Sequence, residues 1–250
     1  MKLKVVGTGS KGNAYLLEND TEALLIECGV NFLEIKKAVD FNISKIKGCI
    51  VTHEHADHSK SLKELIKNGI EVYATFGTFN ALKIDITHHR VNTFDRDNNE
   101  NFINKKIGNF TVKPFKINHD VADPLGFFIN HPETGNVLFL TDSCYSNYTF
   151  KGMNNIIIEA NYSEALIDEK LEDKAFLRDR IYTSHMSLET CLGFFEANDL
   201  SKVNNIVLIH LSDSNSNEKE FKKAVEEQTG KTVYVASNGM VIENFNKIPF

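Results

Sequence analysis

The sequence first excludes several classes of protein by what it lacks. None of its apolar runs approaches the length that spans a bilayer, and its start, Met1–Gly7, has no apolar core of the kind found in secretory signal peptides. The four cysteines are scattered and mostly flanked by apolar residues, which indicates buried thiols rather than a disulfide framework. These absences predict a cytoplasmic protein with no membrane segment.

A basic surface is also missing. Lysine and arginine total 28 against 34 aspartate and glutamate residues, which gives a formal net charge of −6. Proteins that bind long nucleic acids usually carry a basic footprint, because contacts to phosphates supply most of their affinity. Bound divalent cations would offset part of this acidity locally. The balance favours a small anionic substrate over a long polymer.

Linkers, repeats and low-complexity tracts are absent as well. The 42% hydrophobic and 25% charged residues are typical of a soluble globular protein. The length of 250 residues suffices for one large domain or two small ones. Expected strands and helices alternate along the whole chain, so we predict a single domain over residues 1–250.

A glycine-rich loop, Gly7–Asn13, follows the first expected strand and precedes an expected hairpin over residues 14–27. It has no lysine–serine pair and no following helix, which argues against nucleotide binding of the P-loop kind. One interpretation is a strand connection that needs positive φ angles. The other is a wall of a functional pocket, where Ser10 and Asn13 would offer hydrogen bonds to a substrate.

The most informative stretch is Val51–Ser59. Directly upstream, residues 48–51 form a short apolar run that predicts a buried strand, and downstream Ser61–Glu64 fits a capping box that opens a helix. Four potential metal ligands fall within six positions of this stretch: His53, His55, Asp57 and His58. Residues two apart in an extended segment project the same way, so the first two histidines can share one ion, and the other pair can serve a second.

The ligand types in this stretch restrict the chemistry. Imidazole nitrogen and carboxylate oxygen suit zinc, manganese or iron, and no cysteine lies here to close a structural zinc site. Glu54 suggests a metalloprotease motif, but that motif needs a histidine four positions after His53, where this chain has Asp57. The alternative to a metal site is a solvated, histidine-rich loop.

The same strand-then-polar pattern recurs later in the chain. His119 follows the expected strand 110–117, Asp142 follows residues 137–140, and His210 follows residues 205–209. The alternative for the two histidines is a chance position in the core. Three further histidines are expected to lie outside any site: His88 and His89 on the surface, and His131 beside a turn.

The pattern His-x-His-x-Asp-His after an apolar strand resembles the metallo-β-lactamase superfamily. The resemblance implies an α/β (α+β) fold, a four-layer αββα sandwich with the metal site along one edge. It also implies two divalent metal ions, with Zn²⁺ expected and Mn²⁺ as the alternative. Carried over residue by residue, it assigns His53, His55 and His119 to one metal. It assigns Asp57, His58 and His210 to the other, and Asp142 bridges the two.

By the same resemblance, the ligand Asp57 and one further residue, His185, would take part in phosphodiester hydrolysis. The metal pair would activate a water for in-line attack on phosphorus, and Asp57 would orient or deprotonate that water. His185 would protonate the leaving oxygen. The segment Ser184–Ser187 is similar to the histidine motif of the ribonuclease Z branch. The alternative for His185 is a structural or helix-capping role.

Closer similarity is to the WalJ (YycJ) exonuclease branch, in motifs spread over nearly the whole chain. These motifs are Gly9–Ala14, Thr52–His55, Val72–Thr75, His119–Phe127 and Glu159–Asn161. The chain departs from that branch at Ser184–Leu188, where the branch tends to have Gly-His-Leu-Ser-Asn, and at Asp123, where it usually has glutamate. Both changes flank the presumed leaving-group side and put DNA as substrate in doubt.

The chain also resembles the compact anti-Pycsar phosphodiesterases of phages, which open cyclic mononucleotides. Its size, its acidity and the lack of a long substrate-binding arm all favour such a substrate. We therefore expect hydrolysis of cCMP, cUMP, cAMP or cGMP as an immune-evasion activity, in the host cytoplasm if the gene is viral, by a homodimer. The alternatives are a 5′–3′ DNA exonuclease and a thioester or lactone hydrolase. A non-enzymatic binding module would require an incomplete metal set.

Overall fold

In the computed structural model, which describes residues 1–170 and 175–248, the apolar runs form two seven-stranded mixed sheets. The first sheet has the order β14-β1-β2-β3-β4-β5-β6 and the second has the order β13-β12-β11-β10-β9-β8-β7. The strands of the first sheet are β1 (Lys2–Gly7), β2 (Ala14–Glu18), β3 (Ala23–Ile26), β4 (Ile46–Ile50), β5 (Val72–Ala74), β6 (Val91–Thr93) and β14 (Val241–Ile242). Those of the second are β7 (Lys105–Ile107), β8 (Phe110–Lys116), β9 (Leu125–His131), β10 (Gly135–Leu140), β11 (Asn155–Glu159), β12 (Asn205–Ile209) and β13 (Thr232–Val235).

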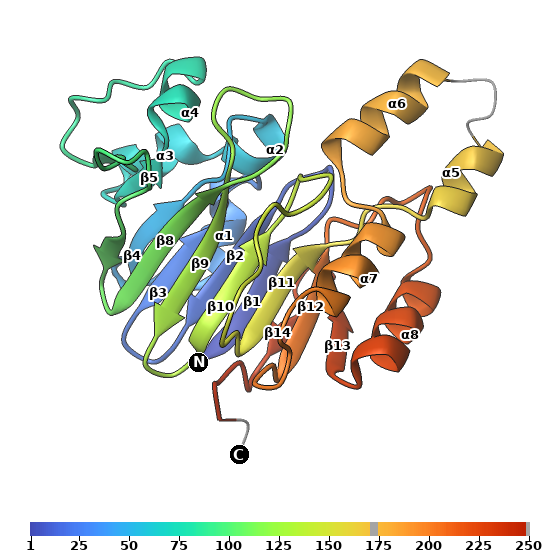
Figure 1. Ribbon diagram of the computed structural model, residues 1–250. Coiled ribbons are helices and arrows are strands. Elements are labelled where there is room, and N and C mark those ends of the chain that lie inside the picture. The colour runs from blue at the N-terminus through green and yellow to red at the C-terminus, as the bar shows by residue number, and fades with distance from the viewer. Residues whose placement is uncertain (171–174, 249–250) are drawn as a thin grey trace.

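Helices cover the outer faces of the two sheets (Figure 1). Those beside the first sheet are α1 (Phe32–Ala38), α2 (Ala56–Ser59), α3 (Leu62–Lys67) and α4 (Phe76–Ala81), and those beside the second are α7 (Leu188–Glu196) and α8 (Glu218–Thr229). Two more, α5 (Glu164–Lys170) and α6 (Ala175–Ser184), stand out from the sandwich at one edge. None of the helices within residues 1–170 and 175–248 has the length and apolar character needed to cross a bilayer.

Three apolar layers hold these elements together. Between the sheets, side chains such as Leu17 from β2 and Phe139 from β10 are fully buried. A second layer packs Ile35 of α1 and neighbouring helices on the first sheet, and a third packs Phe195 of α7 and Phe221 of α8 on the second sheet. Burial of this apolar surface is the main stabilising contribution to such a sandwich. The predicted αββα architecture is confirmed.

Most local predictions agree with the structure, with one correction. The expected hairpin over residues 14–27 is formed by β2 and β3, which pair Glu18 with Ala23, and β9 pairs with β10 in a second hairpin. The capping box predicted at Ser61–Glu64 is wrong. Helix α2 already begins at Ala56, and the hydroxyl of Ser61 donates to the Val30 carbonyl instead of capping α3. The serine therefore ties the loop after β3 to the segment between α2 and α3.

Strand direction gathers the polar loops at one edge of the molecule. Strands β10, β11 and β12 are mutually parallel, so their carboxyl ends meet on the same side. Strand β8 points the same way, because both it and β10 are antiparallel to β9. In the facing sheet, β4 also ends at this edge and is followed by α2 (Figure 1). The segments after these five strands therefore come together.

Candidate metal centre

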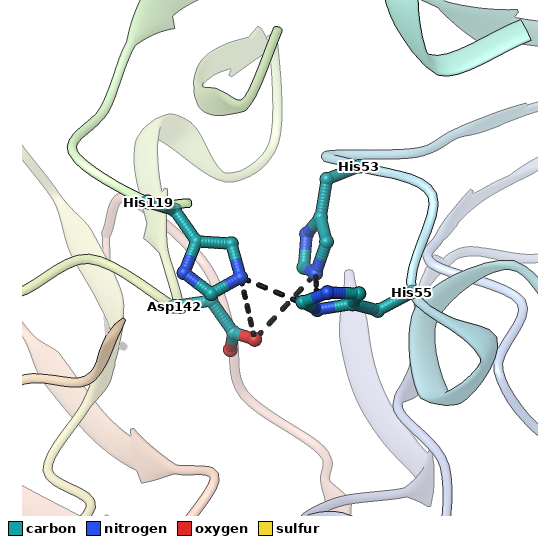
Figure 2. Close-up of side chains that lie close together, drawn as sticks. All are labelled: His53, His55, His119 and Asp142. Carbon is teal, nitrogen blue, oxygen red and sulfur yellow. Dashed lines mark hydrogen bonds and ion pairs between the residues drawn. The ribbon is translucent and has the colours of Figure 1, made fainter. Parts of the chain in front are cut away.

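The first group of converging side chains comes from three separate strand ends. His53 and His55 follow β4, His119 follows β8, and Asp142 follows β10. Figure 2 shows the four side chains pointing toward a common centre. His53 Nε2 lies 3.0 Å from His55 Nδ1, and His119 Nε2 lies 3.3 Å from the same atom. Asp142 Oδ2 lies 3.6 Å from His53 Nε2 and 3.9 Å from His119 Nε2.

A second group lies directly beside the first. The Oδ2 atom of Asp57 is 3.4 Å from His58 Nε2 and 3.4 Å from His210 Nε2. Asp142 connects the two groups, because its Oδ2 is 3.2 Å from His58 Nε2 and its Oδ1 is 3.8 Å from His210 Nε2. The structure thus brings together all seven side chains that the sequence predicts as ligands, in the two predicted groups, with Asp142 between them.

The chemistry of these groups fits a pair of divalent cations. Ring nitrogens that lie 3.0 Å apart would repel one another unless a proton or a cation lay between them. Burial lowers the pKa of His53 well below its usual range, so this imidazole is neutral and has a lone pair to donate. The donor set contains imidazole and carboxylate and no thiolate, which suits zinc, manganese or iron.

Buried negative charge also calls for cations at this position. Although burial alone would raise the pKa of Asp142, the charges of His58 and His210 hold it well below its usual range. For His210, burial lowers the pKa, but Asp142, Asp57 and Glu159 together outweigh it and raise the value to about 10. Protons on these rings thus balance the carboxylates when no metal ion is present. Divalent cations would supply the same compensation without them.

Outer contacts orient the ligating rings. The hydroxyl of Thr52 lies 2.9 Å from His53 Nδ1, and Glu27 Oε1 lies 3.6 Å from His58 Nδ1. The amide of Asn161 lies 3.1 Å from His210 Nδ1. At His53 and His210 the ring nitrogen that faces away from the cluster has a partner within hydrogen-bond distance, the arrangement that fixes ring orientation at metal sites, whereas the Glu27 contact to His58 is too long for a hydrogen bond. Glu27 was not predicted, although it follows an apolar strand as the ligands do.

Glu159 is the most important residue that the sequence analysis did not assign. It is the last residue of β11 and is fully buried, and its Oε1 lies 2.7 Å from His185 Nδ1 and 3.3 Å from His210 Nδ1. Its Oε2 accepts hydrogen bonds from the backbone N–H groups of Ser143 and Met186. The sequence does contain a signal for Glu159, because an acidic residue at the end of an apolar strand is the same pattern that indicates Asp142.

His185 lies at the junction of α6 and α7 and lines the pocket over the cluster. Burial lowers its pKa, but the charge and hydrogen bond of Glu159 outweigh burial and raise it above the ordinary value. The alternative capping role is wrong, because Ser187 caps α7 through a hydrogen bond from the Thr190 N–H. The ring of His185 is thus not engaged in capping α7, and its Nδ1 contacts Glu159 instead.

The backbone is strained or tightly packed at several of these positions. Asp142, His210 and Glu27 have φ angles of 47°, 56° and 64°, in the left-handed region that residues with a Cβ atom rarely adopt. Gly29 packs against the backbone of Asp57, where an added Cβ would lie only 1.7 Å from the carbonyl oxygen. Such strain persists only where the surrounding structure fixes it, and it is typical of functional sites.

A pocket of about 400 Å³ opens onto the cluster. Ser10 lies on its wall, as expected for a residue that contacts a substrate. Asn13 does not, because it is only 1% exposed and its side-chain amide contacts Gly9, the Asp57 carbonyl and His58 Nε2. The predicted substrate contact by Asn13 is therefore wrong, and this residue instead holds the glycine-rich loop against the metal-ligand segment.

The three remaining histidines lie away from the cluster. His88 and His89 stack on each other, with ring centroids 4.6 Å apart, in the polar segment where a surface position was expected. His131 is not a simple turn residue. It is the buried last residue of β9, its Nε2 lies 3.2 Å from Glu22 Oε1, and its ring packs on Phe110.

Comparison with known proteins gives matches over most of the chain. Residues 23–211 match the family described as "Beta-lactamase superfamily domain". Exodeoxyribonuclease YycJ of Bacillus anthracis is 29% identical over 180 residues, which cover 67% of this chain and 65% of that protein. Anti-Pycsar protein Apyc1 of Bacillus phage 010DV004 is 36% identical over 72 residues, which cover 26% of this chain and 28% of that protein. The chain thus spans slightly less than two thirds of the exonuclease relative.

Solved structures show the same fold. The metallo-β-lactamase fold protein YhfI from Bacillus subtilis has a TM-score of 0.71 at 18% identity, covering 97% of this chain and 99% of that one. Human tRNase Z, short form, has a TM-score of 0.64 at 20% identity, with coverage of 97% and 99%. Both likenesses extend over the two sheets and their helices.

Proposed function

Because this chain belongs to the metallo-β-lactamase superfamily, we propose that it is a metal-dependent phosphodiesterase that acts on a nucleotide. The observation that carries the proposal is the convergence of seven imidazole and carboxylate side chains in two groups that share Asp142. Its nuclease relatives support the same class of reaction. In this proposal Zn²⁺ is the preferred ion and Mn²⁺ the alternative, and the enzyme is a cytoplasmic homodimer.

The seven side chains would hold the ions as two sites. His53, His55 and His119 would bind one ion, and Asp57, His58 and His210 the other, with Asp142 shared. When bound, paired divalent ions in such a site polarise a phosphoryl oxygen and lower the pKa of water.

In this proposal Asp57 orients the attacking water. Its side chain is 26% exposed, so one edge of the carboxylate faces the pocket. Burial raises its pKa, but hydrogen bonds from His210 and His58 outweigh burial and hold the pKa far below its usual range. An ionised carboxylate beside the pocket accepts a hydrogen bond from water and fixes its direction.

In this proposal His185 protonates the leaving oxygen. Its Nδ1 is engaged by Glu159 at 2.7 Å, so Nε2 is the nitrogen that can deliver a proton into the pocket. Burial lowers the pKa of His185, but the charge and hydrogen bond of Glu159 raise it above its ordinary value, which favours the protonated ring that a general acid needs. An alkoxide leaving group departs more readily when a positioned acid protonates it, an effect typically worth about 10²–10⁴-fold in rate.

For the substrate we propose a cyclic mononucleotide such as cCMP, cUMP, cAMP or cGMP. The pocket of about 400 Å³ lies at the small end of ligand sites, which typically span about 300–1,000 Å³. Both ester oxygens of a cyclic phosphate belong to one sugar, so one small pocket suffices for the whole substrate. Local similarity to an anti-Pycsar protein and the net charge of −6 support this choice.

A DNA exonuclease is the second candidate, favoured by a separate observation. A wider cavity of about 870 Å³ shares His119 with the metal pocket and is lined by Tyr145, Tyr182 and Lys116. Aromatic rings and a lysine beside the scissile position suit stacked bases and a phosphate backbone. The similarity to exodeoxyribonuclease YycJ supports this candidate.

A thioester or lactone hydrolase would use the same ligands and would have less use for the acid His185.

A substrate panel separates these functions. The metal-loaded protein is incubated with the four cyclic mononucleotides and with end-labelled single- and double-stranded DNA. An Asp142→Asn preparation purified identically controls for contaminating nucleases. We expect conversion of at least one cyclic mononucleotide to its linear monophosphate, with little loss of DNA. Degradation of DNA alone would replace the proposal by the exonuclease.

A further inference from the structure

Helix α6 presents one face to the metal pocket. Leu177, Arg180, Ile181 and Ser184 all line it, and their spacing of three, four and seven positions places them on one side of a helix. The helix stands over the edge where the strands end (Figure 1), and His185 follows its last residue. Helix α6, which ends directly before His185, therefore also forms part of the pocket wall.

Arg180 is the only lysine or arginine among the described residues that line this pocket. Within residues 1–170 and 175–248, its guanidinium makes no hydrogen bond or ion pair. Arg178, on the same helix, differs: its Nη1 lies 3.8 Å from Asp168 Oδ1, and it does not line the pocket. A guanidinium offers five N–H donors in a planar fork that matches phosphate oxygens. Arg180 is thus available to an anionic ligand in the pocket.

Leu177 supplies the apolar part of the same surface. This residue is 42% exposed and lies on the pocket wall, one turn before Arg180 and Ile181. When a ligand covers an exposed aliphatic side chain, apolar surface is removed from water, and this burial stabilises the complex. A nucleotide has both parts that this face requires, an anionic phosphate and an apolar ring system.

We propose that α6 is the nucleotide-recognition element of the site: Arg180 binds the phosphate oxygens, and Leu177 and Ile181 contact the nucleoside. This inference rests on the proposed function for its ligand class, and it assigns the recognition to residues outside the metal cluster. It requires phosphate affinity to depend on Arg180 while metal affinity does not.

Binding of a linear product tests this assignment without relying on turnover. Cytidine 5′-monophosphate and inorganic phosphate are titrated calorimetrically into the zinc-loaded protein and into Arg180→Gln, Arg180→Lys and Arg178→Gln. Loss of a charge-assisted hydrogen-bonding partner is expected to weaken nucleotide binding about 10- to 100-fold in Arg180→Gln. Arg180→Lys should recover part of the affinity, and the matched control Arg178→Gln should bind like the parent. Zinc content should be equal in all four proteins.

Three results would overturn the assignment. These are equal nucleotide affinity in Arg180→Gln and Arg178→Gln, loss of zinc from Arg180→Gln, and a parent protein that binds neither ligand at millimolar concentration. The outcome is separable from that of the proposed function. A protein that cleaves no cyclic mononucleotide but loses nucleotide affinity in Arg180→Gln alone would retain the recognition role and lose the substrate.

Discussion

Two histidine–glutamate contacts, each with a buried glutamate, lie near opposite ends of strand β10 and differ in their surroundings. Before the strand, His131 contacts Glu22 at 3.2 Å and its Nδ1 accepts a hydrogen bond from the Glu133 N–H. Beyond the other end, His185 contacts Glu159 at 2.7 Å, lies 5.3 Å from the His210 ring, and faces a pocket. The His131 side chain is 3% exposed and the His185 side chain is 23% exposed.

The difference bears on the role proposed for His185. Both ring nitrogens of His131 have partners within the protein, so the pair is complete without a ligand. At the other end, one nitrogen of His185 is engaged and the second is left for the pocket, beside imidazoles whose nitrogens face one another. Buried polar groups normally form hydrogen bonds with one another, so a cluster in which imidazole nitrogens face one another is expected to bind an ion or a ligand.

The largest expected effect comes from Asp142→Asn. This change removes the carboxylate that lies between the two ligand groups, so both cations should be held weakly and activity should fall to background. Metal analysis and a phosphodiesterase assay measure the two losses. Asp20→Asn, an exposed change on the β2–β3 turn, is the control and should leave both unaffected. Full metal content and activity in Asp142→Asn would contradict the shared role of this residue.

His185→Ala should lower kcat by about 10²–10⁴-fold for a substrate with a poor leaving group, because the general acid is lost. The deficit should shrink for bis(p-nitrophenyl) phosphate, whose leaving group needs no protonation, and metal content should not change. An equal deficit of His185→Ala with both leaving groups would exclude the acid role.

Glu159→Gln should lower kcat by about 10–100-fold, because His185 would lose the carboxylate that orients it and supplies charge.

Gly29→Ala tests the packing that holds Asp57 in place. The added methyl group would lie against the Asp57 carbonyl, so the segment must shift and the ion bound by Asp57, His58 and His210 should be lost first. One equivalent of bound metal and reduced activity are expected. Gly193→Ala is the matched control, since nothing lies within 4 Å of that position and helix α7 favours alanine. Equal metal content in the two variants would refute this role for Gly29.

At the opposite end of β10, Glu22→Gln should affect stability alone. The Glu22 carboxylate accepts hydrogen bonds from Asn109 N–H and Nδ2 and contacts His131, so the change should lower the free energy of unfolding by about 1–3 kcal/mol. Urea denaturation measures this loss, and kcat should equal that of the parent. A reduced kcat at unchanged stability would show that this contact communicates with the site.

The smallest effect is the pH dependence of that same loss. Burial raises the pKa of Glu22, but hydrogen bonds from Asn109 and His131 outweigh it and lower the pKa below the ordinary value of 4.5. A lowered pKa stabilises the folded state above the unfolded pKa, and this contribution disappears as the pH falls through the folded value. The stability difference between parent and Glu22→Gln should therefore shrink below about pH 4.5. A constant difference would exclude the ionised carboxylate as its source.

Local pattern was sufficient to predict which seven side chains come together, because each lies in a segment that follows an apolar strand and these strands end at one edge. It could not reveal contacts that form only when distant segments meet. In the sequence, Glu159 is only one more polar residue at a strand end, and the fold alone shows that its carboxylate lies between His185 and His210. The sequence predicts Asn13 as a pocket residue, whereas the fold buries it against His58. The face of α6 over the pocket depends likewise on where the helix stands.

The most direct test of the account is the number of divalent ions that the protein binds. The purified chain is stripped with a chelator, loaded with zinc, dialysed, and analysed by inductively coupled plasma mass spectrometry against protein concentration. Two zinc ions per chain are predicted. A folded protein that retains none would contradict the dinuclear centre and, with it, the proposed hydrolase.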